Sequence, residues 1–332
     1  MSAATTPEIT ILRALLEAGD GFVSGAELAK TLGMSRVAVW QHMEKLREQG
    51  FAFEAVRARG YKLTARPAGL NASLLHAYLP ARADRFELLV LPEIDSTNDE
   101  AARQLAAGRP TPFAVIARRQ TRGRGRLGRT WHSGEPGNLY ISFAFRPHLP
   151  PARMPTFTLW MGANLCELIS SFCRATPGLK WPNDLLFDGH KAGGILTEAR
   201  IDADEIRDLV FGLGLNVFVP AGGWPAEIAR RATALSEHAR APLEVNRLTA
   251  ALIGRVLAAY EKFASGVYLK TFGTLWSRYD ILRGRPVAVL HGERRIAGTA
   301  AGIDDEGSLL VRTEKGRTER FHSGEVTLEK KD

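Results

Sequence analysis

The chain has 332 residues, 45% of them hydrophobic and 24% charged. This balance excludes a largely disordered chain, and the length predicts two or three globular domains of about 100–200 residues each. Lysine and arginine number 44 against 36 aspartates and glutamates, and the net charge of +8 favours an anionic partner such as nucleic acid or phosphate.

Residues 1–66 are predicted to form a winged helix-turn-helix domain. Thr6, Ser24 and Ser35 each precede an apolar repeat of helical spacing, where a side-chain oxygen can cap the helix. Gly33 provides the tight turn between the second and third helices, and the alternation after the third helix predicts a hairpin. In this motif the helix after the turn enters the major groove of DNA. The residues expected to face the core are Ile9, Leu12, Leu15 and Leu16 in the first helix, Ala26, Ala29 and Leu32 in the second, and Val39, Met43 and Leu46 in the third.

Polar and basic side chains of this domain are the candidate DNA contacts. Those on the third helix lie off its apolar stripe, and those on the hairpin give the wing an edge that attracts phosphates. They are Ser35, Arg36, Gln41, Lys45, Arg57 and Arg59. A small helical domain that contacts other proteins is the alternative interpretation of the same pattern.

After a linker predicted at 64–69, residues 72–282 alternate strands with helices, which predicts a mixed α/β domain of catalytic size. The strand-like segments are 86–91, 113–117, 139–145, 191–198 and 209–219, and the helix-like segments are 101–107, 158–175 and 246–264. Residues 283–330 contain short strands and polar turns, which predict a small β-barrel.

Cys166 and Cys173 are too few for a disulfide framework or a thiolate zinc site, and we expect both to pack on one face of a helix. The histidines have no metal-binding spacing, so we predict no metal site. We expect no signal peptide, because residues 1–4 do not begin a basic and then apolar segment, and the most apolar stretch, 156–173, is interrupted by Asn164 and Glu167. We therefore expect no membrane segment and a cytoplasmic location.

Residues 120–131 alternate glycine with arginine between two predicted strands. Glycine lets backbone N–H groups approach an anion closely, and guanidinium groups add forked donors and positive charge. The segment lacks the lysine of a P-loop and the spacing of a dinucleotide-binding turn. It predicts a site for the phosphates of a nucleotide. An arginine- and glycine-rich tail that binds nucleic acid is the alternative.

Two further segments are candidates for the same site. Lys180 precedes a rigid Trp-Pro turn, so its ammonium group is held with little freedom and could meet a carboxylate or phosphate oxygen. Ser96 and Thr97 stand between a strand and a helix, where their hydroxyl groups could cap the helix or bind a polar ligand. Taken alone, each pattern also has a purely structural interpretation.

Together and in this order, five segments resemble the biotin–protein ligases. They are 94–98 (IDSTN), 123–131 (GRGRLGRTW), 180–185 (KWPNDL), 191–196 (KAGGIL) and 212–216 (GLGLN). With the helix-turn-helix, the chain is similar over essentially its whole length to the bifunctional members, which are biotin ligases and biotin-operon repressors. The resemblance implies an α+β multidomain fold: an N-terminal winged helix-turn-helix, a central mixed α/β catalytic domain like the class II aminoacyl-tRNA synthetases, and a small SH3-like β-barrel.

The resemblance also implies an activity, that of an ATP-dependent biotin–[acetyl-CoA-carboxylase] ligase. Biotin and ATP form biotinyl-5′-AMP and pyrophosphate, with Mg2+ on the phosphates, and the biotin then passes to a lysine of a biotin carboxyl carrier domain. A homodimer bound to biotinyl-5′-AMP is expected to pair two winged helices on palindromic operator DNA and so repress transcription.

The site residues implied by the resemblance come from the five segments and from Gln120, which lies three residues before the second one. The catalytic residues are Arg126 and Lys180; the biotin contacts are Ser96, Thr97, Asn98, Gln120, Arg124, Gly125, Arg126 and Lys180; the nucleotide contacts are Gly123, Arg129, Lys191 and Asn216. A carboxylate repels a triphosphate, so a site that joins them needs such cations to neutralise both.

Some interpretations stay open. Family members that hold adenine under a tryptophan carry it in the segment that here reads 230–235, which has none, and Trp224 lies too early to take its place. The adenine contact is therefore unassigned.

A ligase that no longer binds an operator, a non-catalytic regulator that senses biotin, and a lipoate ligase are the alternative functions.

Overall fold

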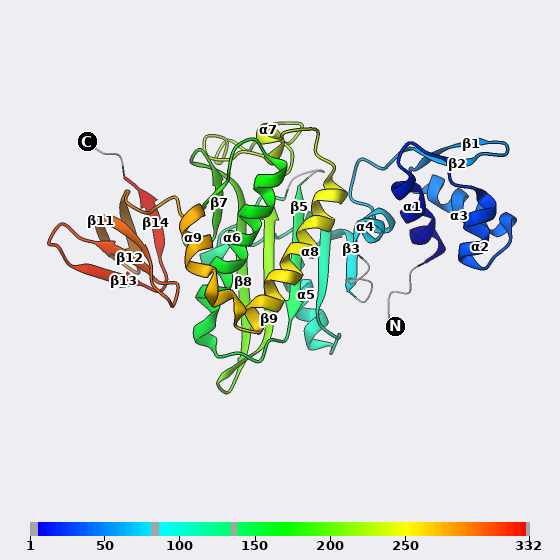
Figure 1. Ribbon diagram of the computed structural model, residues 1–332. Coiled ribbons are helices and arrows are strands. Elements are labelled where there is room, and N and C mark those ends of the chain that lie inside the picture. Colours follow the sequence, from blue (N-terminus) through cyan, green and yellow to red (C-terminus); the bar gives the residue numbers. More distant parts are fainter. Residues whose placement is uncertain (1–5, 81–85, 134–137, 330–332) are drawn as a thin grey trace. The chain divides into compact units, whose positions relative to one another are not determined.

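The computed structural model describes residues 6–80, 86–133 and 138–329 (Figure 1). The chain divides into two compact units. One comprises residues 1–90 with 244–254, and the other comprises residues 91–243 with 255–332.

The first unit begins with the predicted three helices and hairpin. Its elements are α1 (Pro7–Ala18), α2 (Gly25–Leu32), α3 (Arg36–Glu48), β1 (Ala52–Val56), β2 (Gly60–Ala65) and α4 (Ala72–Tyr78). The three predicted caps are present: Thr6, Ser24 and Ser35 accept backbone N–H groups of Ile9, Ala26 and Ala38. The helix-turn-helix prediction is confirmed at the level of secondary structure.

The core of this unit corrects one prediction about α2. Ala26 is exposed, whereas Leu28 is buried together with Leu12, Val39 and Met43. Residues 26 and 28 lie about 200° apart on a helix, so the face that buries Leu28 turns Ala26 to the solvent.

The segment predicted as a linker is partly ordered within the same unit. β2 extends through Ala65. Gly69 O accepts from the Asn246 side-chain amide at 3.0 Å, and Asn246 Oδ1 accepts from the Asn71 N–H at 2.8 Å. Asn246 is fully buried and lies at the start of α8 (Val245–Ala264), so a residue distant in sequence fixes this segment.

The second unit contains a mixed domain built on a seven-stranded sheet. The strand order is β3 (Glu87–Ile94), β4 (Phe113–Gln120), β5 (Leu139–Phe145), β9 (Glu205–Leu215), β8 (His190–Asp202), β7 (Asp184–Phe187) and β6 (Gly178–Lys180). The helices are α5 (Thr97–Ala106), α6 (Met154–Phe172), α7 (Leu235–His238), the part of α8 from Arg255 onward, and α9 (Phe272–Tyr279). The five predicted strands and three predicted helices are present; β5 has the predicted ends, and the ends of the other elements are shifted.

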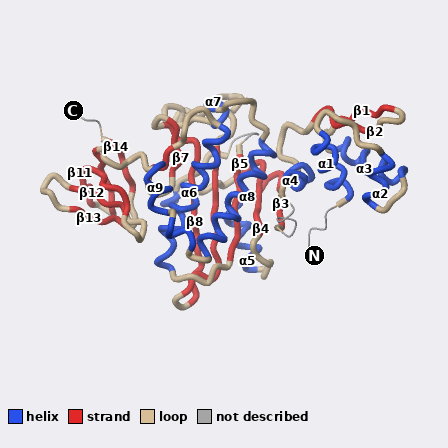
Figure 2. The backbone as a smooth tube through the Cα atoms, viewed as in Figure 1, coloured by secondary structure: helices blue, strands red, loops and turns tan. Residues whose placement is uncertain are grey.

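The two faces of this sheet differ because side chains alternate along a strand. Phe143 and Phe145 of β5 and Phe211 of β9 lie on one face and pack against Phe157 of α6 and Tyr260 of α8. Figure 2 shows α6 and α8 crossing this face. The opposite face carries small residues, and these leave room for the site described below.

The cysteines are both buried and free, as predicted, but they do not share one helix. α6 ends at Phe172, and Cys173 forms an isolated bridge with Ala239. Burial raises the pKa of both thiols.

The C-terminal segment forms the predicted small β domain. Its strand order is β13 (Thr318–Phe321), β12 (Leu309–Arg312), β11 (Arg294–Ile303), β10 (Pro286–His291) and β14 (Glu325–Leu328), all antiparallel. Within the described ranges, no helix combines the length and the apolar character that a bilayer crossing requires.

Candidate active site

A cavity of about 780 Å³ lies in the second unit, on the sheet face that carries the small residues. Cavities of this size hold cofactors and nucleotides. Its walls come from the start of α5, the loop after β4, the β6–β7 turn, β8, β9 and β14. The three segments that the sequence singled out therefore meet in one place, and Arg126 and Lys180 line the same cavity.

Glycines on β8 and β9 create the floor. A Cβ on Gly212 would lie 2.1 Å from Asn98 Oδ1, and a Cβ on Gly214 would lie 2.4 Å from Trp131 Cε2. A Cβ on Gly194 would lie 2.9 Å from the same indole. These positions accept only glycine, because any side chain would displace Asn98 or Trp131 from the sheet.

A hydrogen-bonded network orders one end of the cavity. Gln120 Oε1 accepts from the Thr97 N–H at 2.8 Å and from Thr97 Oγ1 at 3.1 Å. The Ser142 hydroxyl lies 2.8 Å from Thr97 Oγ1 and 2.6 Å from Asn98 Oδ1. Ser96 caps α5 by accepting from the Asp99 N–H. Ser142 is a missed residue: nothing in its local sequence marks it, since only the pairing of β5 with β9 brings it under α5.

The arginine- and glycine-rich loop folds back on itself as a short hairpin. The Gly125 N–H donates to Arg129 O at 2.7 Å, and the Trp131 N–H donates to Gly123 O at 2.9 Å. Gly125, Arg126 and Arg129 line the cavity. Gly123, predicted to contact a nucleotide, is absent from the cavity's lining. It packs against Trp131 O and Ser133, where a Cβ would lie 2.6 Å from the carbonyl oxygen.

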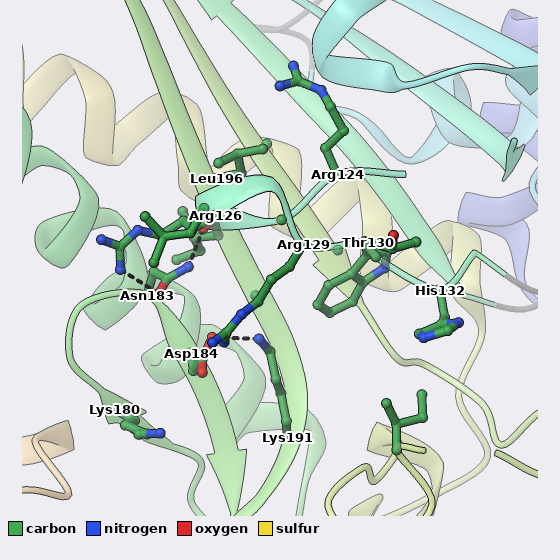
Figure 3. Close-up of a pocket in the computed structure, with 18 of the residues that line it drawn as sticks. Arg124, Arg126, Arg129, Thr130, His132, Lys180, Asn183, Asp184, Lys191 and Leu196 are labelled. Atoms are coloured by element: carbon green, nitrogen blue, oxygen red, sulfur yellow. Dashed lines mark hydrogen bonds and ion pairs between the residues drawn. The ribbon is translucent and has the colours of Figure 1, made fainter. Parts of the chain in front are cut away.

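Arg124 is held by two carboxylates. Its guanidinium donates to both oxygens of Glu198 at 2.9 Å and to Asp99 Oδ1 at 2.6 Å. Figure 3 shows its side chain directed away from Arg129 and Lys191. The sequence did not mark Glu198, which lies 74 residues further along the chain.

The other cations gather at the opposite end of the cavity (Figure 3). Lys191 Nζ lies 2.6 Å from Asp184 Oδ1, and Arg129 pairs with Glu325 of β14. Because Glu325 accepts a hydrogen bond from Arg129, the pKa of its carboxyl group lies below the usual range. Asp184 and Glu325 were not predicted as site residues, although Asp184 belongs to the motif of Lys180.

Arg126 and Lys180 differ from these paired cations. Arg126 Nη1 donates only a 3.4 Å hydrogen bond to Asn183 Oδ1. Among the residues that the structure describes, neither Arg126 nor Lys180 has a carboxylate within ion-pair distance. Burial lowers the pKa of both groups, with nearby Asp184 acting in the opposite direction. The cavity therefore holds two half-buried cations that form no ion pair with any described residue.

Asn216 and two tryptophans complete the walls. The Asn216 amide donates to Thr233 O at 3.1 Å and to Lys191 O at 3.3 Å, so it also braces the backbone. Trp224 lines the cavity. So does Trp131, whose buried indole N–H has no acceptor among the described residues. Within those residues, no three His, Cys, Asp or Glu side chains cluster as metal ligands.

The candidate DNA contacts lie on the first unit. All six residues, Ser35, Arg36, Gln41, Lys45, Arg57 and Arg59, are exposed. The Ser35 hydroxyl is used by the α3 cap, Lys45 Nζ lies 3.7 Å from Glu8, and the Arg59 guanidinium lies 4.2 Å from the Phe22 ring centre.

Three family models match the chain in succession. The "HTH domain" model matches residues 8–62, the "Biotin/lipoate A/B protein ligase family" model matches residues 90–216, and the "Biotin protein ligase C terminal domain" model matches residues 283–328.

Curated relatives match nearly the whole chain. The "Bifunctional ligase/repressor BirA" of Bacillus spizizenii is 33% identical over 315 residues, covering 94% of this chain and 95% of that protein. The protein of the same description from Escherichia coli is 33% identical over 320 residues, covering 96% of both. The solved biotin protein ligase from Aquifex aeolicus in complex with biotin and ATP is 31% identical with a TM-score of 0.62, covering 74% of this chain and 99% of that one.

Proposed function

This chain belongs to the biotin protein ligases that carry a helix-turn-helix domain, and from that premise we propose how its cavity performs the reaction. Its activity is that of a biotin–[acetyl-CoA-carboxylase] ligase. In the first step a carboxylate oxygen of biotin attacks the α-phosphorus of ATP and pyrophosphate leaves. In the second step a lysine amine of the carrier domain attacks the acyl carbon of biotinyl-5′-AMP, AMP leaves and the amine loses a proton.

The ureido ring of biotin binds at the end of the cavity formed by Ser96, Thr97, Asn98 and Gln120. Ureido N–H groups need acceptors. Both Nδ2 protons of Asn98 are taken, by Leu196 O at 3.2 Å and Glu198 Oε2 at 2.7 Å. Its Oδ1, which already accepts from the Ser142 hydroxyl at 2.6 Å, therefore keeps a fixed orientation and has a second lone pair that can accept from biotin.

Arg126 and Lys180 bind the biotin carboxylate and the α-phosphate. Each can take an anion without breaking an existing ion pair, unlike Arg124, Arg129 and Lys191. Where the effective dielectric constant is about 20, a unit charge at 4 Å contributes about 4 kcal/mol, which offsets the repulsion between the two reactants. The backbone of Gly125 and Arg126 covers the acyl phosphate.

The remaining phosphates and the base occupy the end near Arg129, Lys191 and Asn216. Trp131 supplies a flat aromatic face to the cavity. We place adenine against Trp131. Gly123 shapes the loop and does not contact the nucleotide. Asp184 and Glu325 are oxygen donors of the kind Mg2+ takes, and a magnesium ion on the phosphates would neutralise part of their charge.

The second surface is the helix-turn-helix. Arg36, Gln41 and Lys45 of α3, with Ser35 at its cap, face the major groove, and Arg57 and Arg59 of the wing contact phosphates. Binding of biotinyl-5′-AMP promotes a homodimer that pairs two such domains on operator DNA. We place both activities in the cytoplasm, where ATP, carrier protein and DNA meet.

The observation that carries the proposal is that one cavity contains Arg126 and Lys180, two cations that form no ion pair with the described residues. The test incubates the protein with ATP, biotin and a carrier domain and detects biotinylated lysine with streptavidin. Label on the carrier supports a ligase, and no label with any carrier domain contradicts it.

A gel shift with biotin, ATP and promoter fragments of biotin-synthesis genes tests repression separately. Transfer without any shift favours a ligase that has lost operator binding. A shift without biotin-dependent pyrophosphate release favours a non-catalytic regulator.

A further inference from the structure

Glu198 of β8 bonds to two parts of the cavity at once. Its Oε1 and Oε2 each accept from the Arg124 guanidinium at 2.9 Å, and its Oε2 also accepts from Asn98 Nδ2 at 2.7 Å. Arg124 belongs to the loop that walls the cavity, and Asn98 belongs to the first turn of α5. One carboxylate therefore ties the loop to the biotin end.

Glu198 and Asp99 together hold the Arg124 guanidinium, and we call this set of three side chains the clamp. A bidentate arginine–carboxylate pair fixes the relative orientation of its partners more firmly than a single bond does. Asp99 Oδ1 accepts a further bond from Arg124 at 2.6 Å, so the guanidinium is held from α5 as well as from β8. The three charged side chains are between 37% and 41% exposed, which leaves them within reach of solvent and able to open.

We propose that Glu198 is a positioning residue that holds the loop over the cavity through Arg124 and presents Asn98 Oδ1 to biotin. This inference rests on the proposed function. It assigns the Arg124 side chain to loop closure instead of to the acyl phosphate, because binding an anion would require it to leave three hydrogen bonds to carboxylates.

The clamp matters most after the first step. Biotinyl-5′-AMP is a reactive mixed anhydride that must stay enclosed until the acceptor lysine arrives. The loop supplies the wall of Gly125, Arg126 and Arg129, and the adenylate leaves only if that wall moves. A looser clamp therefore predicts faster loss of the adenylate.

The substitution Glu198→Gln tests the proposal because it keeps an acceptor for Asn98 and removes the charge that holds Arg124. The control is Glu93→Gln. Glu93 of β3 accepts from Arg119 of β4 at 2.9 Å in an exposed ion pair, and neither residue lines the cavity. Both full-length variants are assayed for adenylate dissociation, for KM with biotin and with ATP, and for tryptic cleavage within residues 122–129.

For Glu198→Gln we expect the adenylate to dissociate about three- to tenfold faster, the range for a partly exposed charge network. KM for biotin should rise by a similar factor, KM for ATP should stay unchanged, and trypsin should cut the loop faster. Glu93→Gln should match the parent protein in every assay.

The opposite assignment, Arg124 as an anion ligand, gives the opposite sign. Removing Glu198 would then free Arg124 and slow the dissociation of the adenylate. Slower or unchanged dissociation, or an equal effect in Glu93→Gln, overturns the proposal. If the parent protein forms no adenylate, the proposed function fails, and tryptic cleavage at the parental rate in Glu198→Gln separately refutes the clamp.

Discussion

Replacing Gly212 by alanine tests how closely the sheet must approach α5 for the biotin end to form. The new Cβ would lie 2.1 Å from Asn98 Oδ1 and 2.9 Å from its Cγ, whereas ordinary contact starts at 3.4 Å. Asn98 must therefore move by about 1 Å. A displacement of that size in a positioning group lowers the rate of reaction about a hundredfold. The move also strains its buried hydrogen bond with Ser142 and its partly buried one to Glu198, at about 1–3 kcal/mol of unfolding free energy.

The assay for Gly212→Ala is titration calorimetry with biotin, combined with denaturant unfolding. We expect the Kd for biotin to rise about ten- to a hundredfold, because a buried ureido N–H that loses its acceptor costs about 1–3 kcal/mol of binding free energy. The control is Gly273→Ala in α9, where an added Cβ meets nothing within 4 Å and alanine favours the helix. Parental biotin affinity in Gly212→Ala would refute the role of Asn98, and an equal loss in Gly273→Ala would refute the local argument.

Three further predictions concern charge, DNA and stability. Burial lowers the pKa of Lys180 below 10.5, so kcat/KM for biotin should decline as the pH rises through that lowered pKa, and Lys180→Arg should move the decline to higher pH; identical pH profiles would contradict this. Arg57→Ala and Arg59→Ala should each reduce the slope of log K against log salt for DNA binding by about 0.9 in fluorescence anisotropy, and an unchanged slope would remove them from the interface. Asn246→Ala should lower the unfolding free energy of the first unit by about 1–3 kcal/mol, because it leaves the buried Asn71 N–H without its acceptor; an unchanged denaturation midpoint would refute that.

Capping residues and hydrophobic periodicity predict the elements that depend on contacts between residues close in sequence. Ser35 caps α3 as its position before an apolar repeat indicates, and β5 spans the predicted residues 139–145. Short elements were missed: β6 and β7 have three and four residues, too few to show a period. The prediction that Ala26 faces the core is wrong. An eight-residue helix offers few turns from which its buried face can be identified, and in α2 the buried face is the one that carries Leu28.

The candidate site divides in the same way. Motif order identified Lys180 and Arg126, and the structure brings both to one cavity. The partners of the arginines could not be predicted, since pairing Arg124 with Glu198 requires the folded sheet. The need for glycine at position 212 could not be predicted either, because it arises from the close approach of Asn98, which is distant in sequence.

The most direct measurement of the central claim is biotin-dependent exchange of labelled pyrophosphate into ATP, which reports the first step alone. The protein should catalyse exchange only with biotin present, and Lys180→Met and Arg126→Met should each lose about a hundredfold or more, because the reactants' repulsion is then uncompensated. Exchange without biotin, or parental rates in both variants, would contradict the account.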